Sequence, residues 1–193
     1  MDNSLVVKLR QMTSAGMMDC RTALEETNGD LEAAAELLRK KGMAKAAKRG
    51  ERETREGVVA MYSHANKRLG AMVELLSETD FVSRNSDFQA LANDLAMHVA
   101  AMNPLYLSPE DIPQEVLDKE REIYSEEFAG SGKPKEIIDK IVDGKMGKFY
   151  EDTCLLKQKF VKDEDITIDE LVKQKIGVIG ENIRIRRFAR FEI

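Results

Sequence analysis

Apolar residues recur every three or four positions at the start of the chain, which is the spacing of one face of an α-helix. The first run follows Ser4, a residue type that favours helix N-termini, and consists of Leu5, Val6, Leu9 and Met12. A break at residues 13–16 separates this run from a second one, and a third run follows Asp30. The pattern predicts three helices, the first of them capped by Ser4.

The expected ends of these helices carry ordinary stop signals. Asn28-Gly29 is typical of a helix C-terminus, and Asp30 is a good cap for the helix that follows. That third helix is expected to end at Gly42, because residues 39–41 place positive charge in its last turn and complement the helix dipole. We therefore predict a three-helix domain over residues 1–42, a size that is only marginally stable alone.

Residues 43–56 carry many charges and no apolar face. Such a stretch is typical of a linker, and its alanine-rich beginning favours helix at the start. A nucleic-acid contact through its basic residues is the alternative interpretation, but a solvated linker is favoured.

Three strands are expected in the second part of the chain, residues 57–193. The apolar runs 57–63 and 69–76 are separated by five polar-rich residues, which predicts a hairpin. A third strand is predicted over 182–193, where two kinds of position alternate. One expected face carries Ile183, Ile185, Ala189, Phe191 and Ile193, and the other carries Arg184, Arg186, Phe188 and Arg190. These strands would form a three-stranded antiparallel sheet covered by helices on one side.

Helices are expected between these strands. An apolar stripe from Phe88 onward predicts a helix that stops before Asn103-Pro104. Ser108-Pro109 is typical of the start of another helix. After a break at 130–134, a second helix is expected to run back along the first. The two would form a helical hairpin over about 109–157, with one more helix near 167–177. The expected fold class is α+β.

Composition excludes several classes of function. The net charge of -5 argues against binding nucleic acid by broad charge attraction. Cys20 and Cys154 lie far apart with no histidine cluster, which indicates neither a disulfide framework nor a zinc site. The N-terminus lacks the apolar core of a signal peptide and no stretch approaches a membrane span, so a cytoplasmic protein is expected.

No residue pattern indicates catalysis. The two histidines, His64 and His98, have no partner at the spacing of a nucleophile or a metal site. His98 borders an apolar stripe and is interpreted as a partly buried structural residue. His64 lies in the predicted hairpin turn and is a candidate for contact with a partner. We expect no enzyme activity, no cofactor and no metal.

An acid and an aromatic residue stand side by side where the second strand ends, in the sequence Thr79-Asp80-Phe81-Val82. One interpretation is a local turn, with Phe81 and Val82 packed in the core. The other is a wedge, in which Asp80 and Phe81 project together from a rigid strand end. An aromatic side chain that enters a pocket on a partner is typical of protein–protein recognition. The residues alone leave both interpretations open.

Several blocks of sequence together resemble the elongation factor Ts family, the guanine-nucleotide exchange factors for elongation factor Tu in bacterial translation. They are Gly16-Met-Met-Asp-Cys20 with its surroundings, ETDFVSRN, DLAMHVAAMNP, SGKPKEI and IGENIRIRRFARFE. The blocks occur in the family's order and cover essentially the whole chain. The resemblance implies a ubiquitin-associated-like N-terminal domain followed by an exchange-factor core.

The resemblance also implies a mechanism and a set of contacts. Residues 79–82 would enter the GTP-binding domain of elongation factor Tu near its Mg²⁺. Phe81 would act as the wedge, and Asp80 would disturb the ion's surroundings so that GDP leaves. The further contacts implied for the N-terminal domain and the hairpin turn are Arg10, Met17, Met18 and His64, one of the two methionines being expected in the core.

One departure from the family pattern bears on assembly. Long members carry two related core subdomains, whereas this chain has residues for one. It therefore resembles the short form, in which two chains pair through their sheets. That implies a homodimer that binds two copies of elongation factor Tu, with no membrane and no direct nucleic-acid partner. The alternatives from the residues alone are a nucleic-acid-binding protein and a ubiquitin-type or nascent-chain adaptor.

Overall fold

The computed structural model describes residues 3–128, 132 and 134–193. The chain divides into two compact units, which are treated separately below. The first comprises Met1–Ala60, Glu74–Asn93 and Glu170–Arg186, and the second comprises Met61–Val73, Asp94–Asp169 and Arg187–Ile193. The division runs across a sheet, so each unit contains one end of its strands and one half of a long helix.

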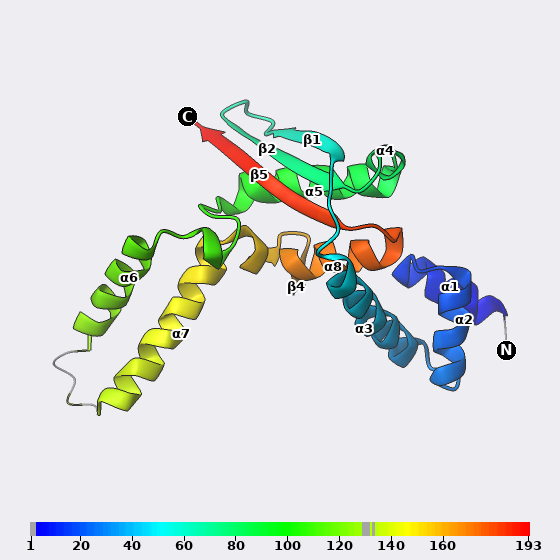
Figure 1. Cartoon of the computed structure of the whole chain (residues 1–193), viewed down its shortest axis with the longest axis horizontal. Helices are drawn as coiled ribbons and strands as arrows, with labels where there is room; N and C mark the ends of the chain where they lie inside the picture. Colours follow the sequence, from blue (N-terminus) through cyan, green and yellow to red (C-terminus); the bar gives the residue numbers. More distant parts are fainter. Residues whose placement is uncertain (1–2, 129–131, 133) are drawn as a thin grey trace. The chain divides into compact units, whose positions relative to one another are not determined.

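Three helices begin the first unit, as predicted: α1 (Asn3–Thr13), α2 (Met17–Glu26) and α3 (Leu31–Arg49) (Figure 1). They enclose a small apolar core made of Val6, Leu9, Cys20, Ala23, Leu24 and Ala34. Gly29 ends α2 with a positive φ of 86°, and the Asp30 carboxylate accepts hydrogen bonds from two backbone N–H groups of α3. The cap predicted at Ser4 is wrong. Ser4 lies inside α1, because the helix already begins at Asn3. The side chain of Asn3 accepts a hydrogen bond from the Arg21 guanidinium.

The third helix does not end at Gly42 but continues to Arg49. Gly42 lies against Gly177, which has no room for a side chain: a Cβ added to Gly177 would lie only 2.7 Å from the Cα of Gly42. Gly177 belongs to α8 (Ile168–Ile179), the helix predicted before the terminal strand. The extension buries Ala46, which is 3% exposed. The predicted linker therefore begins as helix, as expected, and its helical part packs closely against α8.

The predicted three-stranded antiparallel sheet is confirmed. Its strands are β1 (Glu56–Ser63), β2 (Leu69–Ser77) and β5 (Ile183–Glu192), in the order β1-β2-β5. The N–H of His64 donates to the carbonyl of Leu69 at 2.8 Å and closes the hairpin. Helix α5 (Ser86–Met102) runs along one face of the strands (Figure 1). The buried residues of the sheet include Ala71, Val73, Leu75, Ile183 and Ile185.

The far end of β5 faces the opposite way from the prediction. Ile183 and Ile185 are buried as expected, but the alternation shifts by one residue after Arg186. Arg190 turns toward α5, where its Nε donates a hydrogen bond to the carbonyl of Ala100 at 2.9 Å. This guanidinium satisfies a helix carbonyl that an apolar side chain could not. Ala189, Phe191 and Ile193, which were predicted to share the inner face with Ile183 and Ile185, are therefore exposed.

The second unit contains the predicted helical hairpin of α6 (Gln114–Glu126) and α7 (Lys135–Thr153). The Lys145 ammonium lies over the rings of Tyr124 and Phe128, 5.4 and 5.1 Å from their centroids, and pairs with Glu127. These contacts join the two helices. The predicted break at 130–134 lies largely outside the described residues.

The hairpin's first helix begins later than predicted, at Gln114. Asp111 accepts hydrogen bonds from the N–H and the hydroxyl of Ser108, which caps only the 3-10 turn Pro109–Asp111. Ile112 is then extended, with φ -78° and ψ 126°, because a following proline disfavours helical backbone. Pro113 thus separates the capped turn from the helix.

Two short elements complete the second unit. A 3-10 turn, Leu155–Lys157, follows α7, and β3 (Lys159–Phe160) pairs antiparallel with β4 (Asp163–Thr167). The pattern of residues did not predict this small sheet. Within the part of the chain that the structure describes, no helix is long and apolar enough to cross a membrane.

Candidate functional site

The candidate wedge occupies a tight corner between β2 and α5. Thr79 is extended, with φ -127° and ψ 158°, and a single helical turn follows as α4 (Asp80–Ser83). Ser83 is buried, and its hydroxyl donates to the carbonyl of Asp80 at 2.9 Å. The Ser77 hydroxyl donates to the Thr79 carbonyl at 3.0 Å on the other side. Short-range hydrogen bonds thus fix the backbone on both sides of the motif.

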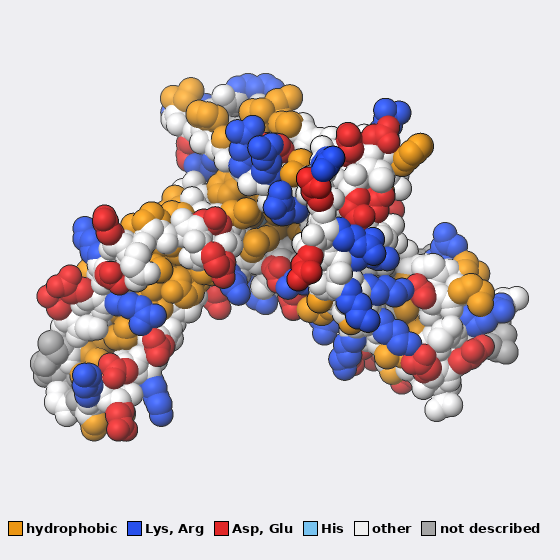
Figure 2. All heavy atoms as spheres, in the orientation of Figure 1, with side chains coloured by type: hydrophobic (Ala, Val, Ile, Leu, Met, Phe, Trp, Pro, Cys, Tyr) orange, Lys and Arg blue, Asp and Glu red, His pale blue; other side chains and the backbone are white. Residues whose placement is uncertain are grey.

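Phe81 points into solvent, with 82% of its surface exposed. The interpretation that packs Phe81 in the core is therefore wrong. Phe88, seven residues later on α5, is fully buried, and Val82 is half-buried. Figure 2 shows hydrophobic atoms standing out beside α4 among charged side chains. A phenyl ring exposed to this degree on a folded corner leaves apolar surface free to enter a partner.

Asp80 is also accessible. Its carboxylate pairs with Arg84 at 3.1 Å, and the two side chains are 44% and 79% exposed. Such an exposed ion pair is worth about 0–1 kcal/mol, so the Asp80 carboxylate can leave Arg84 for another contact at little cost. The acid and the aromatic of the motif therefore stand together on one exposed turn.

Two glutamates absent from the predicted site hold this corner. The backbone N–H and the hydroxyl of Thr79 donate to the two carboxylate oxygens of Glu181, at 3.0 and 2.7 Å. Glu78, next to Thr79, in turn accepts the N–H of Asn182 at 2.6 Å. Spacing along the chain could not reveal a contact between positions 102 residues apart. The only signal was the block IGEN, which contains both Glu181 and Asn182.

The candidate contacts of the N-terminal domain border an open hollow in the same unit. Met17 is 39% exposed and Met18 is 69% exposed, so neither methionine belongs to the core and that expectation was wrong. Arg10 and Met17 line the hollow together with Val7, Gln11, Ser14 and Asp87. Asp87 lies in the first turn of α5, seven residues after Asp80. The structure thus brings Arg10 and Met17 together with the segment that follows the wedge.

His64 lies in the second unit, in the hairpin turn, and is exposed. Its Nδ1 is 3.0 Å from the hydroxyl oxygen of Tyr62. His64 therefore stays a separate candidate contact.

His98 is fully buried, more deeply than predicted, and its contacts are structural. Its Nδ1 accepts the N–H of Val161 at 3.2 Å, so the proton is on Nε2, which donates to Gln158 Oε1 at 3.1 Å. Burial lowers the pKa of His98 below its ordinary value and keeps the ring neutral. Burial likewise raises the pKa of the Cys154 thiol, which disfavours the reactive thiolate. Neither environment favours a reactive form of the side chain.

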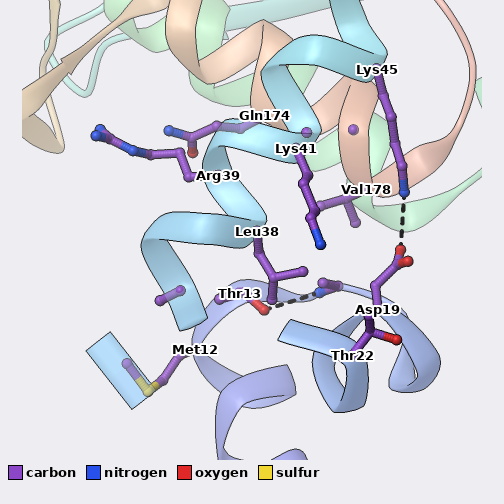
Figure 3. Close-up of a pocket in the computed structure, with 14 residues that line it drawn as sticks. Met12, Thr13, Asp19, Thr22, Leu38, Arg39, Lys41, Lys45, Gln174 and Val178 are labelled. Carbon is purple, nitrogen blue, oxygen red and sulfur yellow. Dashed lines mark hydrogen bonds and ion pairs between the residues drawn. The ribbon is translucent and has the colours of Figure 1, made fainter. Parts of the chain in front are cut away.

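A second hollow, of about 260 Å³, lies in the first unit between the α1–α2 break, α3 and α8 (Figure 3). Its wall carries Arg39, Lys41 and Lys45. Lys45 pairs with Asp19 at 3.2 Å, and Lys41 pairs with Glu26 at 2.6 Å. Because two of the three cations already have carboxylate partners, the hollow offers little free positive charge to a ligand. This hollow lies beside the place where α3 packs closely on α8.

The described residues include no group of three or more His, Cys, Asp or Glu side chains that could hold a metal ion.

Comparison with known proteins gives a consistent result. A family model described as "Elongation factor TS" matches residues 32–177. Elongation factor Ts of Thermosipho melanesiensis is 54% identical over 189 residues, covering 98% of this chain and 96% of the relative. The same protein of Fervidobacterium nodosum is 52% identical with the same coverage. That of Carboxydothermus hydrogenoformans is 50% identical, covering 99% of this chain and 88% of the relative. The likeness extends over nearly the full length of each chain.

Proposed function

This chain belongs to the elongation factor Ts family of translation elongation factors, and we propose that residues 79–82 drive its action as an exchange factor. It binds elongation factor Tu carrying GDP and promotes release of the nucleotide, so that GTP can enter. The observation that carries this proposal is the exposure of Phe81, 82%, on a corner whose backbone is fixed by hydrogen bonds.

The proposed mechanism acts on the ion that holds the nucleotide. Phe81 inserts between side chains of the partner's GTP-binding domain, and Asp80 enters beside the Mg²⁺ site. A bound Mg²⁺ is the largest local charge in such a site and bridges the phosphate oxygens. Moving its ligands therefore weakens the hold on GDP more than the loss of one ordinary hydrogen bond would. No bond is made or broken in this chain, so the proposed role is not that of an enzyme.

The wedge needs support from other contacts. Burying one Phe side chain is worth about 1.5–3 kcal/mol. Moving a two-state equilibrium from one side to the other takes about 5.5 kcal/mol. We assign the difference to the surface around Arg10, Met17 and Met18, whose flexible thioethers suit an adaptable apolar contact. His64 supplies a further contact from the hairpin turn.

The effects of GDP and of this protein on each other's binding to elongation factor Tu must be equal. Because linkage is symmetric, GDP must weaken the binding of this protein by the factor by which the protein weakens the binding of GDP. The place of action we propose is the cytoplasm, where translation takes place.

We further propose that two copies of this chain pair through the outer faces of their sheets, giving a two-plus-two complex with elongation factor Tu. The support lies in the second unit, where Met61, Phe191 and Ile193 are 71%, 72% and 87% exposed. Figure 2 shows hydrophobic side chains gathered over the sheet beside the β1–β2 turn. Exposed apolar side chains gathered in this way are typical of an interface between proteins.

The dimer is tested by light scattering on the protein and on the double variant Met61→Lys, Phe191→Lys. Both side chains are exposed, so the variant is expected to fold. We expect twice the monomer mass for the wild type and the monomer mass for the variant. A wild type that is monomeric at micromolar concentration would contradict the dimer.

Exchange is tested by following release of fluorescent GDP from purified elongation factor Tu after mixing with this protein. We expect the release rate to rise with the concentration of the protein and to saturate. Equilibrium binding at increasing GDP concentration should show the reciprocal weakening. Release that stays at its spontaneous rate with an excess of folded protein would overturn the proposed function.

A further inference from the structure

The single turn α4 cannot hold the candidate wedge in place by itself. It has four residues, and an isolated helical turn this short is unstable in water. Phe81, 82% exposed, has almost no packing of its own to fix its direction. The position of the ring therefore depends on how firmly the backbone just before Asp80 is anchored.

Glu181 anchors that point with both of its carboxylate oxygens. Oε2 accepts the Thr79 N–H at 3.0 Å, and Oε1 accepts the Thr79 hydroxyl at 2.7 Å. Two bonds from one carboxylate to the same residue fix its rotation as well as its position. Hydrogen bonds to an ionised acceptor are also stronger than those between neutral groups. Thr79 is the residue on which the turn begins, so its orientation sets the direction of the turn.

A second carboxylate holds the same corner from the other side. Glu78 Oε1 accepts the N–H of Asn182 at 2.6 Å, so the segments 78–79 and 181–182 each supply an acceptor to the other. The Asn182 side chain donates to the carbonyls of Gly50 and Arg52, at 3.3 and 2.7 Å. These carbonyls lie just beyond α3. The end of the N-terminal helices is therefore tied to the junction that holds the wedge.

We propose that Glu181 is a positioning residue for nucleotide exchange: it holds Thr79 so that Asp80 and Phe81 enter the partner in the productive direction. The proposal rests on the function proposed above and assigns Glu181 no contact with the nucleotide. It follows from two features. The exposed ring of Phe81 cannot orient itself, and both carboxylate oxygens of Glu181 accept hydrogen bonds from Thr79, the residue before the turn. At the reacting centre of an enzyme a misplacement of about 1 Å can cost about a hundredfold in rate, and we take that figure as the upper scale for a misdirected wedge.

The test compares Glu181→Ala with Glu122→Ala, an exposed glutamate on α6, in the GDP-release assay. The release rate is measured over a full range of protein concentrations, after thermal melts have shown that each variant is folded. For Glu181→Ala we expect the maximal release rate to fall about ten- to a hundredfold, while the half-saturating concentration changes much less. Glu122→Ala should match the wild type. The split arises because the other contacts still bind the partner when the wedge is misdirected.

A merely structural role is separated by combining the variant with Phe81→Ala. If Glu181 acts only by placing the wedge, Glu181→Ala lowers the maximal rate strongly in the wild-type background and hardly at all when the ring is already missing. An equal loss in both backgrounds would overturn the proposal, because Glu181 would then act independently of Phe81. A maximal rate of Glu181→Ala equal to that of the wild type would overturn it too.

Amide hydrogen exchange gives a readout that does not depend on elongation factor Tu. In Glu181→Ala the peptide that contains residues 78–83 should exchange about tenfold faster or more, while peptides of the second unit keep their protection. Unchanged protection at this corner would overturn the anchoring by Glu181. Absence of GDP release with the wild-type protein would instead overturn the proposed function, so the two failures are distinguishable.

Discussion

The two units use polar side chains in opposite ways. In the second unit, His98 and Gln158 are 0% and 2% exposed, and their hydrogen bonds close a core. In the first unit, Glu181 and Thr79 are half-buried, and the hydrogen bonds between them hold the start of the turn that carries the exposed Phe81. The first arrangement hides its polar groups, and the second presents a side chain to solvent. The difference separates residues that support the fold from residues that support a contact.

The difference also has an energetic side. A buried group that loses its partner costs about 1–3 kcal/mol, because water cannot replace the partner. At a half-exposed corner water can enter, so the loss to stability is smaller. We therefore expect the core of the second unit to govern stability, and the corner of the first to govern exchange.

The largest effect on stability is expected from Gln158→Leu. Gln158 accepts from His98 and donates to the carbonyls of Met102 and Asp152, at 3.3 and 2.9 Å. Leucine would leave these groups unpaired, so the free energy of unfolding in urea should fall by about 3 kcal/mol or more. Gln114→Leu, on the exposed start of α6, should change it by less than about 0.5 kcal/mol. Equal effects of the two variants would show that the buried hydrogen bonds of Gln158 do not govern stability.

A smaller effect is expected where two helices meet at glycine. Gly177→Ala places a Cβ 2.7 Å from the Cα of Gly42, and neither backbone can yield cheaply. The free energy of unfolding should fall by about 1–3 kcal/mol. Gly144→Ala is the matched control, since nothing lies within 4 Å of its added Cβ in α7, and it should stabilise by about 0.5–1 kcal/mol. Thermal melts that rank the two variants in the reverse order would refute the close packing of α3 on α8.

The smallest effect expected is a dependence of stability on pH. Burial lowers the pKa of His98, so the unfolded chain binds a proton that the folded chain does not as the pH falls below about 6.5. The stabilisation from neutral His98 is therefore present above that pH and is lost on acidification. The slope is at most about 1.4 kcal/mol per pH unit for one proton. Urea unfolding between pH 7.5 and 5.5 should show the slope in the wild type and a flatter profile in His98→Asn.

The sequence predicted most of the elements, because each depends on neighbouring residues. The periodic apolar stripes located the helices, and Asp30 capped α3 as its residue type suggests. Gly42 misled because a glycine after basic residues is typical of a helix end, whereas here it lies within α3 against Gly177, 135 positions away. Arg190 misled for a similar reason, since its acceptor is a carbonyl of another element.

The candidate site was predicted only in part. The motif at 79–82 drew attention by its composition, but a Phe is more often buried than exposed, so the sequence could not choose between core and wedge. The two phenylalanines of this segment differ completely in burial, since Phe88 is fully buried while Phe81 is 82% exposed. Glu181 was missed because its role depends on a contact with Thr79 that only folding creates.

In the proposed mechanism Phe81 acts on the partner and contributes nothing to the fold. The most direct measurement compares Phe81→Ala with the wild type in two assays, urea unfolding and release of fluorescent GDP from elongation factor Tu. Because the ring is 82% exposed, the free energy of unfolding should change by less than about 0.5 kcal/mol. The maximal rate of GDP release should fall at least about tenfold, while binding to the partner persists. Full exchange activity in the variant would contradict this role of Phe81, since the wedge would then lie elsewhere.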